Sequence, residues 1–240
     1  MIYDRLFKSK EKKLAVLIDP GKITTDKLIL TVKNSQKSGV DIFFVGGSII
    51  SQNIDNTIKI IKDNSDIPVI LFPGSIYQLS DNADAVLLLS LISGRNPEFL
   101  IGNQVIAAPF LKKSKLEVIS TGYILIDGGT KTSVEYMSNT KPIPTDKTDI
   151  AVATALAGEM LGMSAIYLEA GSGAHFPVNK DIIKEIKENI KIPIIAGGGI
   201  RNKEDLETTC IAGADIIVTG TAFENNPELI NKFSEIIHSY

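Results

Sequence analysis

The chain has 240 residues and a formal net charge of −3, a size that suits one large domain. Hydrophobic residues make up 44% and charged residues 22% of it, as in ordinary globular proteins, and the slightly acidic balance excludes the basic surface of a nucleic-acid-binding protein. The single cysteine, Cys210, excludes an intrachain disulfide and indicates a cytoplasmic, reducing location.

The N-terminal segment, residues 1–13, is basic and lacks the apolar core of a secretion signal. It predicts a short helix over one end of the domain. The longest apolar run, Ala85 to Ile92, is far below the ~20 residues that a spanning helix requires. We therefore expect no membrane-spanning segment.

Short apolar runs alternate with helical patterns along the whole chain. The runs are nearly continuous in apolar residues, which is typical of parallel strands covered on both faces. The predicted strands are Leu14–Ile18, Ile42–Val45, Val69–Phe72, Ala85–Leu89, Val118–Asp127, Ala165–Leu168, Ile194–Ala196 and Ile216–Thr219.

Helices are predicted between most of these strands. Gly39 is a good stop for a helix over Lys27–Ser38, and Asn96-Pro97-Glu98 is typical of a helix start. The other predicted helices are Thr148–Leu161, Asp181–Asn189, Lys203–Ala212 and Pro227–Ser239. The alternation predicts an α/β fold, a single (β/α)8 TIM barrel over residues 1–240, with an open doubly wound sheet as the competitor.

One connection is too short for a full helix. Only about a dozen residues separate Phe72 from Ala85, and a helix with its two turns needs at least ~10–12. We expect a shortened or irregular third helix region and a thin wall, whose Ile76, Tyr77 and Leu79 could leave a groove for an apolar ligand. A short loop that packs its own side chains is the alternative.

Polar residues follow the first two strands, at the end of a barrel where reactive groups gather. Asp19 follows a run of apolar residues, and Ser48 follows the second strand. A carboxylate and a hydroxyl there are suitable ligands for Mg²⁺. Alternatively, Asp19 only shapes the Asp-Pro-Gly turn.

Glu169 is the best candidate for a general base. It ends a buried strand, where desolvation would raise its proton affinity, although it could instead only accept backbone hydrogen bonds. Tyr167 points the same way, so its hydroxyl could orient a substrate hydroxyl, or its ring could simply fill the barrel interior.

Three late strands run into glycine-rich turns. These are Gly171-Ser172-Gly173, Gly197-Gly198-Gly199 and Gly220-Thr221. Glycine lets backbone N–H groups approach an anion closely, so the turns predict a phosphate site, a common feature after the last strands of barrels. Each turn alone could be purely structural.

Four other residues carry weaker expectations. Asp127 could line the site or only turn the chain, and Arg201 could approach the phosphate, although a solvent-facing salt bridge suits it better. His175 suits a surface or capping role, and Cys210 should be inert core.

The motifs Leu17-Ile18-Asp19-Pro20-Gly21-Lys22, Gly46-Gly47-Ser48, Tyr167 to Gly173, Ala196 to Arg201 and Gly220-Thr221 occur in order along the whole chain. In this combination the chain resembles the geranylgeranylglyceryl phosphate synthases, which include the bacterial PcrB-type heptaprenylglyceryl phosphate synthases. It looks like the second of the two groups of that family.

The resemblance implies a prenyltransferase of ether-lipid biosynthesis that joins sn-glycerol 1-phosphate to a polyprenyl diphosphate, with Mg²⁺ as cofactor. By matching position, Asp19 and Ser48 would hold the metal. Leu17 stands where some relatives carry lysine, and Thr221 where asparagine is usual. The residues that would hold glycerol 1-phosphate are Tyr167, Leu168, Glu169, Ala170, Gly171, Ser172, Gly173, Gly198, Gly199, Gly220 and Thr221.

Other functions fit parts of the same pattern. A flavin-dependent oxidoreductase or a phosphosugar isomerase or aldolase would use the same phosphate turns, and a non-catalytic barrel could bind a phosphometabolite. An exposed apolar helix face would favour a homo-oligomer.

Overall fold

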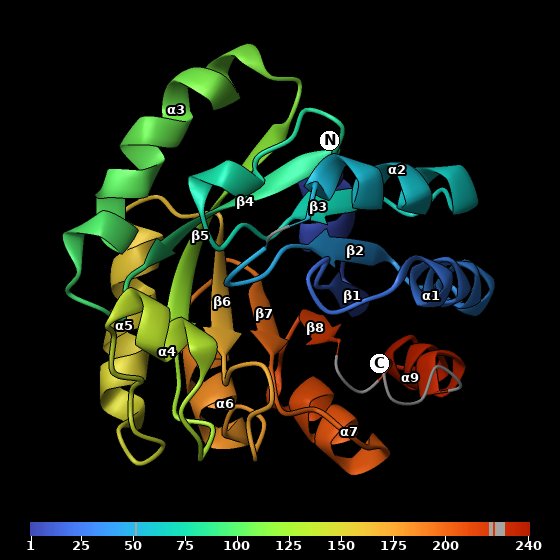
Figure 1. Cartoon of the computed structure of the whole chain (residues 1–240). Helices are drawn as coiled ribbons and strands as arrows, with labels where there is room; N and C mark the ends of the chain where they lie inside the picture. The colour runs from blue at the N-terminus through green and yellow to red at the C-terminus, as the bar shows by residue number, and fades with distance from the viewer. Residues whose placement is uncertain (51, 221–222, 224–228) are drawn as a thin grey trace.

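A computed structural model describes residues 1–50, 52–220, 223 and 229–240. Eight parallel strands close into a barrel in chain order, β1 to β8 (Figure 1), which confirms the predicted TIM barrel. Every predicted strand is present, with ends that differ by a residue or two. The strands are β1 (Lys13–Ile18), β2 (Ile42–Val45), β3 (Val69–Leu71), β4 (Ala85–Leu91), β5 (Glu117–Leu125), β6 (Ala165–Glu169), β7 (Ile194–Gly197) and β8 (Ile216–Thr219).

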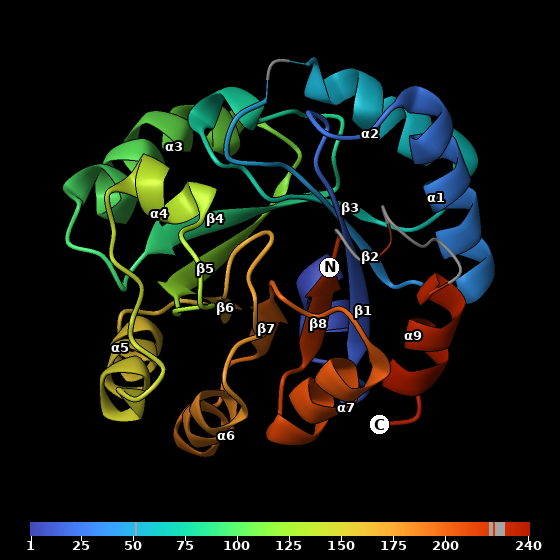
Figure 2. The ribbon, with the colours of Figure 1, turned by 60° about the horizontal axis from the view of Figure 1, so that its bottom comes forward.

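Helices surround the strands (Figure 2). The sequence prediction missed α2 and α4, and the first two residues of its last helix, 227 and 228, lie outside the described residues. Gly39 ends the first helix in a left-handed conformation, with φ at 74°, as predicted. The helices are α1 (Thr25–Ser38), α2 (Ile54–Asn64), α3 (Asn103–Lys113), α4 (Ser133–Ser138), α5 (Thr148–Met160), α6 (Lys180–Asn189), α7 (Lys203–Ala212) and α9 (Leu229–Ile237).

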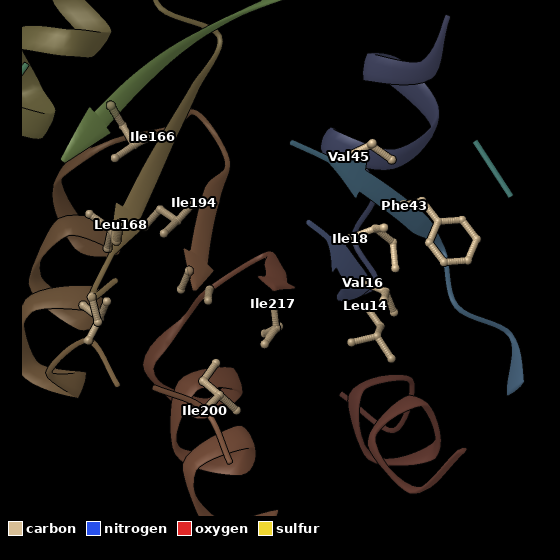
Figure 3. Close-up of a cluster of buried hydrophobic side chains, with 14 of the residues drawn as sticks. Leu14, Val16, Ile18, Phe43, Val45, Ile166, Leu168, Ile194, Ile200 and Ile217 are labelled. Carbon is tan, nitrogen blue, oxygen red and sulfur yellow. The ribbon is translucent and has the colours of Figure 1, made fainter. Parts of the chain in front are cut away.

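Side chains that alternate along the strands build two apolar layers. On β6, Ile166 and Leu168 face the helices, whereas Ala165 and Tyr167 face the barrel interior. Figure 3 shows part of the outer layer, with side chains from β1, β2, β6, β7 and β8. Because both faces are buried, the strands read as continuous apolar runs.

A π-helical turn, Tyr3–Phe7, closes one end of the interior layer. Its Leu6 and Phe7 are buried, and the Glu117 carboxylate accepts the N–H groups of Ile2 and Tyr3. This confirms the short N-terminal helix. In the described part of the chain, no helix combines the length and apolar character needed to cross a bilayer.

The connection from β3 to β4 contains only a 3-10 turn, Ile76–Gln78, so the shortened third helix region is confirmed. Tyr77 is 90% exposed and does not line the adjacent cleft. Its predicted place in the groove is therefore wrong, because three residues of tight helix turn this side chain outward. After β4, a π-helical turn, Glu98–Gly102, leads into α3.

Candidate active site

A cleft of about 730 Å³ opens where the strands end. It brings together most of the residues predicted from the sequence, from the turns after β1, β2, β6, β7 and β8. Leu168, Ala170 and Gly171 do not line it, and Thr221 lies outside the described residues. The predicted site residues that line the cleft are Asp19, Ser48, Tyr167, Glu169, Ser172, Gly173, Gly198, Gly199 and Gly220.

Glu169 is the buried acid of the cleft, with only 6% of its surface exposed. Burial raises the pKa of its carboxyl, as predicted, and hydrogen bonds from Gly171, Tyr123 and Tyr167 offset part of that rise in pKa. The Gly171 N–H donates to Oε1 at 2.6 Å. Glu169 is thus positioned by hydrogen bonds and also has the raised proton affinity that suits a general base.

Two tyrosines and a phenylalanine pack beside this carboxyl. The ring of Tyr167 stacks on Phe72, with centroids 5.0 Å apart, and lies 5.3 Å from the ring of Tyr123. Tyr167 therefore fills the barrel interior and also brings its hydroxyl to Glu169. Sequence reasoning missed Tyr123, because its strand register with Tyr167 becomes known only once β5 and β6 are paired.

The turns after β6 and β7 require glycine. Gly198 has φ at 84°, and a Cβ there would lie 2.7 Å from Oε1 of Glu169 and 2.6 Å from N of Gly171. Gly199 has φ at 75°, and its Cβ would meet the Phe176 carbonyl oxygen at 2.3 Å. A side chain at either position would both strain the backbone and displace the neighbouring turn.

Arg201 joins these two turns. Its Nη2 donates to the carbonyl oxygens of Ala174 at 2.7 Å and of Gly173 at 3.3 Å. Among the described residues the guanidinium group forms no salt bridge of the predicted kind and binds backbone carbonyls instead. Arg201 fixes the turn after β6 against the turn after β7.

The three predicted residues that miss the cleft are used within the fold. Leu168 points into the outer apolar layer, since side chains alternate along β6. The Ala170 N–H donates to the Gly197 carbonyl oxygen at 3.0 Å, and the Gly171 N–H is held by Glu169. These residues shape the turn that carries Ser172 and Gly173.

Asp19 follows β1, which pairs with β8 in the closed barrel, and its carboxylate lies against Gly47. A Cβ on Gly47 would lie 2.9 Å from Cγ and from both carboxyl oxygens of Asp19. Oδ1 accepts the Gly21 N–H at 2.9 Å, so Asp19 also shapes its own turn. Lys22 Nζ lies 3.2 Å from Oδ2 of Asp19 and 3.5 Å from Oγ of Ser172.

This donor set fits Mg²⁺. Among residues 1–50, 52–220, 223 and 229–240, no three His, Cys, Asp or Glu side chains converge on one point. Mg²⁺ needs no such cluster, because it keeps several waters and is commonly held by one or two carboxylates together with substrate phosphates. The Asp19 carboxylate and the Ser48 hydroxyl, both in residues that line the cleft, would supply hard oxygen ligands of that kind.

Cations are few in this cleft. Leu17 lines it beside Gly220, so β1 brings an apolar side chain to the glycine turns. Of the described residues that line the cleft, Lys22 and Arg201 are the cationic ones. Sequence reasoning gave Lys22 no role, although it follows Asp19 by three residues.

The other arm of the cleft is apolar and follows the thin wall. Ile76 and Leu79 line it, as predicted. Its remaining lining includes side chains from β4, the turn after it, α3 and α4, among them Val86, Leu88, Phe99, Ala107 and Met137. A single cleft therefore joins the polar turns to an apolar groove.

Three weaker candidates are placed by the structure. Oδ1 of Asp127 accepts the Gly129 N–H at 2.9 Å, and Asp127 does not line the cleft, so it turns the chain. His175 is exposed. Cys210 is a buried core residue, as predicted, and burial raises the pKa of its thiol to about 11.

Comparison with known proteins shows a family match over most of this chain. The model of the PcrB family matches residues 7–238. A geranylgeranylglyceryl phosphate synthase of Chitinophaga pinensis is 51% identical over 95% of this chain and 91% of its own length. One of Methanosphaera stadtmanae is 44% identical over 95% of this chain and 93% of its own length.

A solved structure is similar over the whole chain. It is a crystal structure of (S)-3-O-geranylgeranylglyceryl phosphate synthase from Thermoplasma acidophilum in complex with its substrate sn-glycerol-1-phosphate. The TM-score is 0.92 and the identity 34%, with 100% of this chain and 97% of that chain covered.

Proposed function

The chain belongs to the PcrB family, and from this premise we propose that it transfers a polyprenyl group to sn-glycerol 1-phosphate and forms an ether bond. One observation carries the proposal: a single cleft holds glycine turns, a buried acid and an apolar groove in continuity. A phosphorylated, hydroxyl-bearing acceptor and a long apolar donor are the substrates that these three parts accommodate.

The glycine turns would hold the acceptor. The phosphate would accept hydrogen bonds from backbone N–H groups of Gly173, Gly199 and Gly220, an anion site of the kind that barrels carry after their last strands. A phosphate bound there would place the glycerol hydroxyl beside Glu169. Glu169 is the last residue of β6, and its carboxylate lies between the turns after β6 and β7. Tyr167 would orient that hydroxyl.

The reaction is then a substitution at the prenyl C1 carbon. The glycerol oxygen forms the new bond to C1, and its proton passes to the Glu169 carboxylate. The bond from C1 to the diphosphate oxygen breaks, and the diphosphate leaves with the electron pair. Holding both substrates in line can lower the reaction barrier by about 7–11 kcal/mol.

Asp19 and Ser48 would hold Mg²⁺ at the end of the cleft where the diphosphate would lie. When bound, Mg²⁺ supplies the positive charge that stabilises the departing diphosphate. Lys22, held by Asp19 at 3.2 Å, would add its own charge at the same place.

The apolar arm would bind the prenyl chain. Each CH₂ group removed from water contributes about 0.8 kcal/mol, so a long chain in a groove lined by Leu88, Phe99 and Ala107 would supply much of the donor's affinity. The shortened connection between β3 and β4 supports this assignment, because its Ile76 and Leu79 face the groove.

We also propose that the protein forms a homo-oligomer in the cytoplasm. Val105 and Ile106 are exposed on α3, and apolar side chains gathered on one helix surface favour association. The buried free thiol of Cys210 suits a reducing compartment.

The experiment is to incubate the purified protein with Mg²⁺, a C20 prenyl diphosphate and either sn-glycerol 1-phosphate or sn-glycerol 3-phosphate. We expect an ether-linked product from the 1-phosphate and loss of turnover when the metal is chelated. Product from the 3-phosphate alone, or none from either, would contradict the proposed function. Turnover that persists after chelation would contradict the metal assignment only.

A further inference from the structure

Gln78 is a polar side chain buried in the thin wall, with 5% of its surface exposed. It lies at the end of the 3-10 turn, 31 residues from Gly47 along the chain. Its Nε2 donates to the Gly47 carbonyl oxygen at 2.7 Å, and its Oε1 accepts the Gly47 N–H at 3.3 Å. Oε1 also accepts the Gly74 N–H at 3.0 Å. One side chain thus binds both backbone polar groups of Gly47.

The Asp19 carboxylate packs directly against the backbone of Gly47. A Cβ on Gly47 would lie 2.9 Å from Cγ and from both carboxyl oxygens of Asp19, so the Gly47 backbone approaches Asp19 closely. Ser48 is the next residue, so a shift of the Gly47 backbone moves both proposed metal ligands relative to one another.

The turn after β3 locks the same segment from the other side. A Cβ on Gly74 would lie 2.4 Å from the Gly47 carbonyl oxygen and 3.0 Å from Cα of Ser48. The two turns therefore pack backbone against backbone, and the Gln78 amide is the side chain that hydrogen-bonds to both. Replacement of this amide by an apolar group would remove all three of these hydrogen bonds to the backbone of Gly47 and Gly74.

We propose that Gln78 is a positioning residue for the Asp19 and Ser48 metal seat. The inference rests on the proposed function. It assigns two roles to the short connection between β3 and β4. Ile76 and Leu79 face the apolar groove, while Gln78, from the same short segment, holds the Gly47 backbone under Asp19. The wall that accommodates the prenyl chain thereby also fixes the site that holds its diphosphate.

The test measures thermal stabilisation of the protein by two ligands without turnover. One is Mg²⁺ with inorganic pyrophosphate, and the other is glycerol 1-phosphate. For Gln78→Met we expect the half-saturating concentration of Mg²⁺ with pyrophosphate to rise about 10- to 100-fold, as for residues that orient metal ligands. The response to glycerol 1-phosphate should stay unchanged, because among the described residues the Gln78 side chain hydrogen-bonds to Gly47 and Gly74, after β2 and β3, and not to the turns after β6 to β8.

Ser80→Ala is the matched control. Ser80 lies two residues farther along the same connection, and its hydroxyl donates to the Asp55 carboxylate on α2. This variant loosens the connection without touching Gly47, so its response to Mg²⁺ with pyrophosphate should match that of the wild type. Gln78→Glu, which keeps the acceptor and removes the donor to Gly47, should show a smaller loss than Gln78→Met.

The outcomes separate the inference from the function beneath it. If Mg²⁺ with pyrophosphate does not raise the thermal stability of the wild type, both the proposed metal site and the inference are contradicted. A wild type that responds, together with Gln78 variants that respond equally, contradicts the inference alone. An equal loss of the response to Mg²⁺ with pyrophosphate in Gln78→Met and Ser80→Ala would also overturn the inference. If Gln78→Met does not fold, the same comparison is made between Gln78→Glu and Ser80→Ala.

Discussion

Lys22 Nζ lies 3.2 Å from Oδ2 of Asp19 and 3.5 Å from Oγ of Ser172. The ammonium group thus stands between the proposed metal ligand and the turn that would hold the acceptor phosphate. Leu17 supplies no charge from β1, so in the proposed function Lys22 would face the anionic groups of both substrates.

Lys22→Met should lower kcat/KM for both substrates by about 10- to 100-fold, since hydrogen bonds to charged groups contribute about 1.5–3 kcal/mol. Steady-state kinetics with each substrate varied in turn measures the loss. Lys203→Met is the control, because Lys203 is a comparably exposed lysine with an acidic partner, Glu207, at 3.3 Å, and it does not line the cleft. Equal activity of the two variants would rule out this role for Lys22.

Glu169→Gln should lower kcat by about 10²- to 10⁴-fold, the range for loss of a general base. Burial raises the pKa of Glu169 above its ordinary value of 4.5, and the reaction needs its carboxylate. The kcat/KM of the wild type should therefore fall as pH is lowered through that raised pKa. A pH–rate profile with no such limb above pH 4.5 would contradict the assignment.

The same pKa shift predicts a gain in stability for Glu169→Gln. The folded state disfavours the charged carboxylate, so the wild type loses stability as pH rises from the unfolded pKa through the raised folded pKa. The neutral amide lacks this penalty. At pH 8 the melting temperature of the variant should be higher than that of the wild type. The difference should shrink at pH 4, where the carboxyl group is mostly protonated in both the folded and the unfolded state.

Gly198→Ala should raise the KM for glycerol 1-phosphate by at least tenfold, because the added Cβ would displace Glu169 and Gly171, and tenfold corresponds to about 1.4 kcal/mol. Gly162→Ala is a close control. Gly162 has the same φ of 84° but open space around its Cβ position, so it reports the cost of left-handed backbone alone. A Gly162→Ala variant with the same kinetic defect would show that backbone strain, and not the crowded turn, is responsible.

Ala107→Phe should narrow the apolar arm and shorten the prenyl chain that is accepted. Ala107 is buried on α3 and lines the cleft, whereas its neighbour Ile106 is exposed and does not. The ratio of kcat/KM for C20 over C15 prenyl diphosphate should fall by about tenfold or more in Ala107→Phe, since each lost CH₂ contact is worth about 0.8 kcal/mol. Ile106→Phe should keep the wild-type ratio. A fall of this ratio in both variants would show that the prenyl chain does not bind in this groove.

The sequence predicted the barrel and most of the cleft for clear physical reasons. Strands buried on both faces leave continuous apolar runs, and residues at their ends gather at one rim. Asp19, Glu169 and the glycine turns were recognisable because each follows such a run directly. The short connection before β4 was recognisable from its length alone.

The residues that sequence reasoning missed act through tertiary geometry. Tyr123 meets Glu169 only because β5 pairs with β6 in a particular register, and Gln78 reaches Gly47 across 31 residues. Tyr77 was misplaced because a 3-10 turn, unlike a strand, does not alternate its side chains between two faces. Leu168 was assigned to the site by position in a motif, although alternation along β6 turns it outward.

The central claim is that glycine turns after β6, β7 and β8 seat one phosphate beside Glu169. A crystal structure with bound sn-glycerol 1-phosphate tests this most directly. We predict the phosphorus among the backbone N–H groups of Gly173, Gly199 and Gly220, with a glycerol hydroxyl within hydrogen-bonding distance of the Glu169 carboxylate. A phosphate bound elsewhere, or turns that stay empty at saturating ligand, would contradict the account.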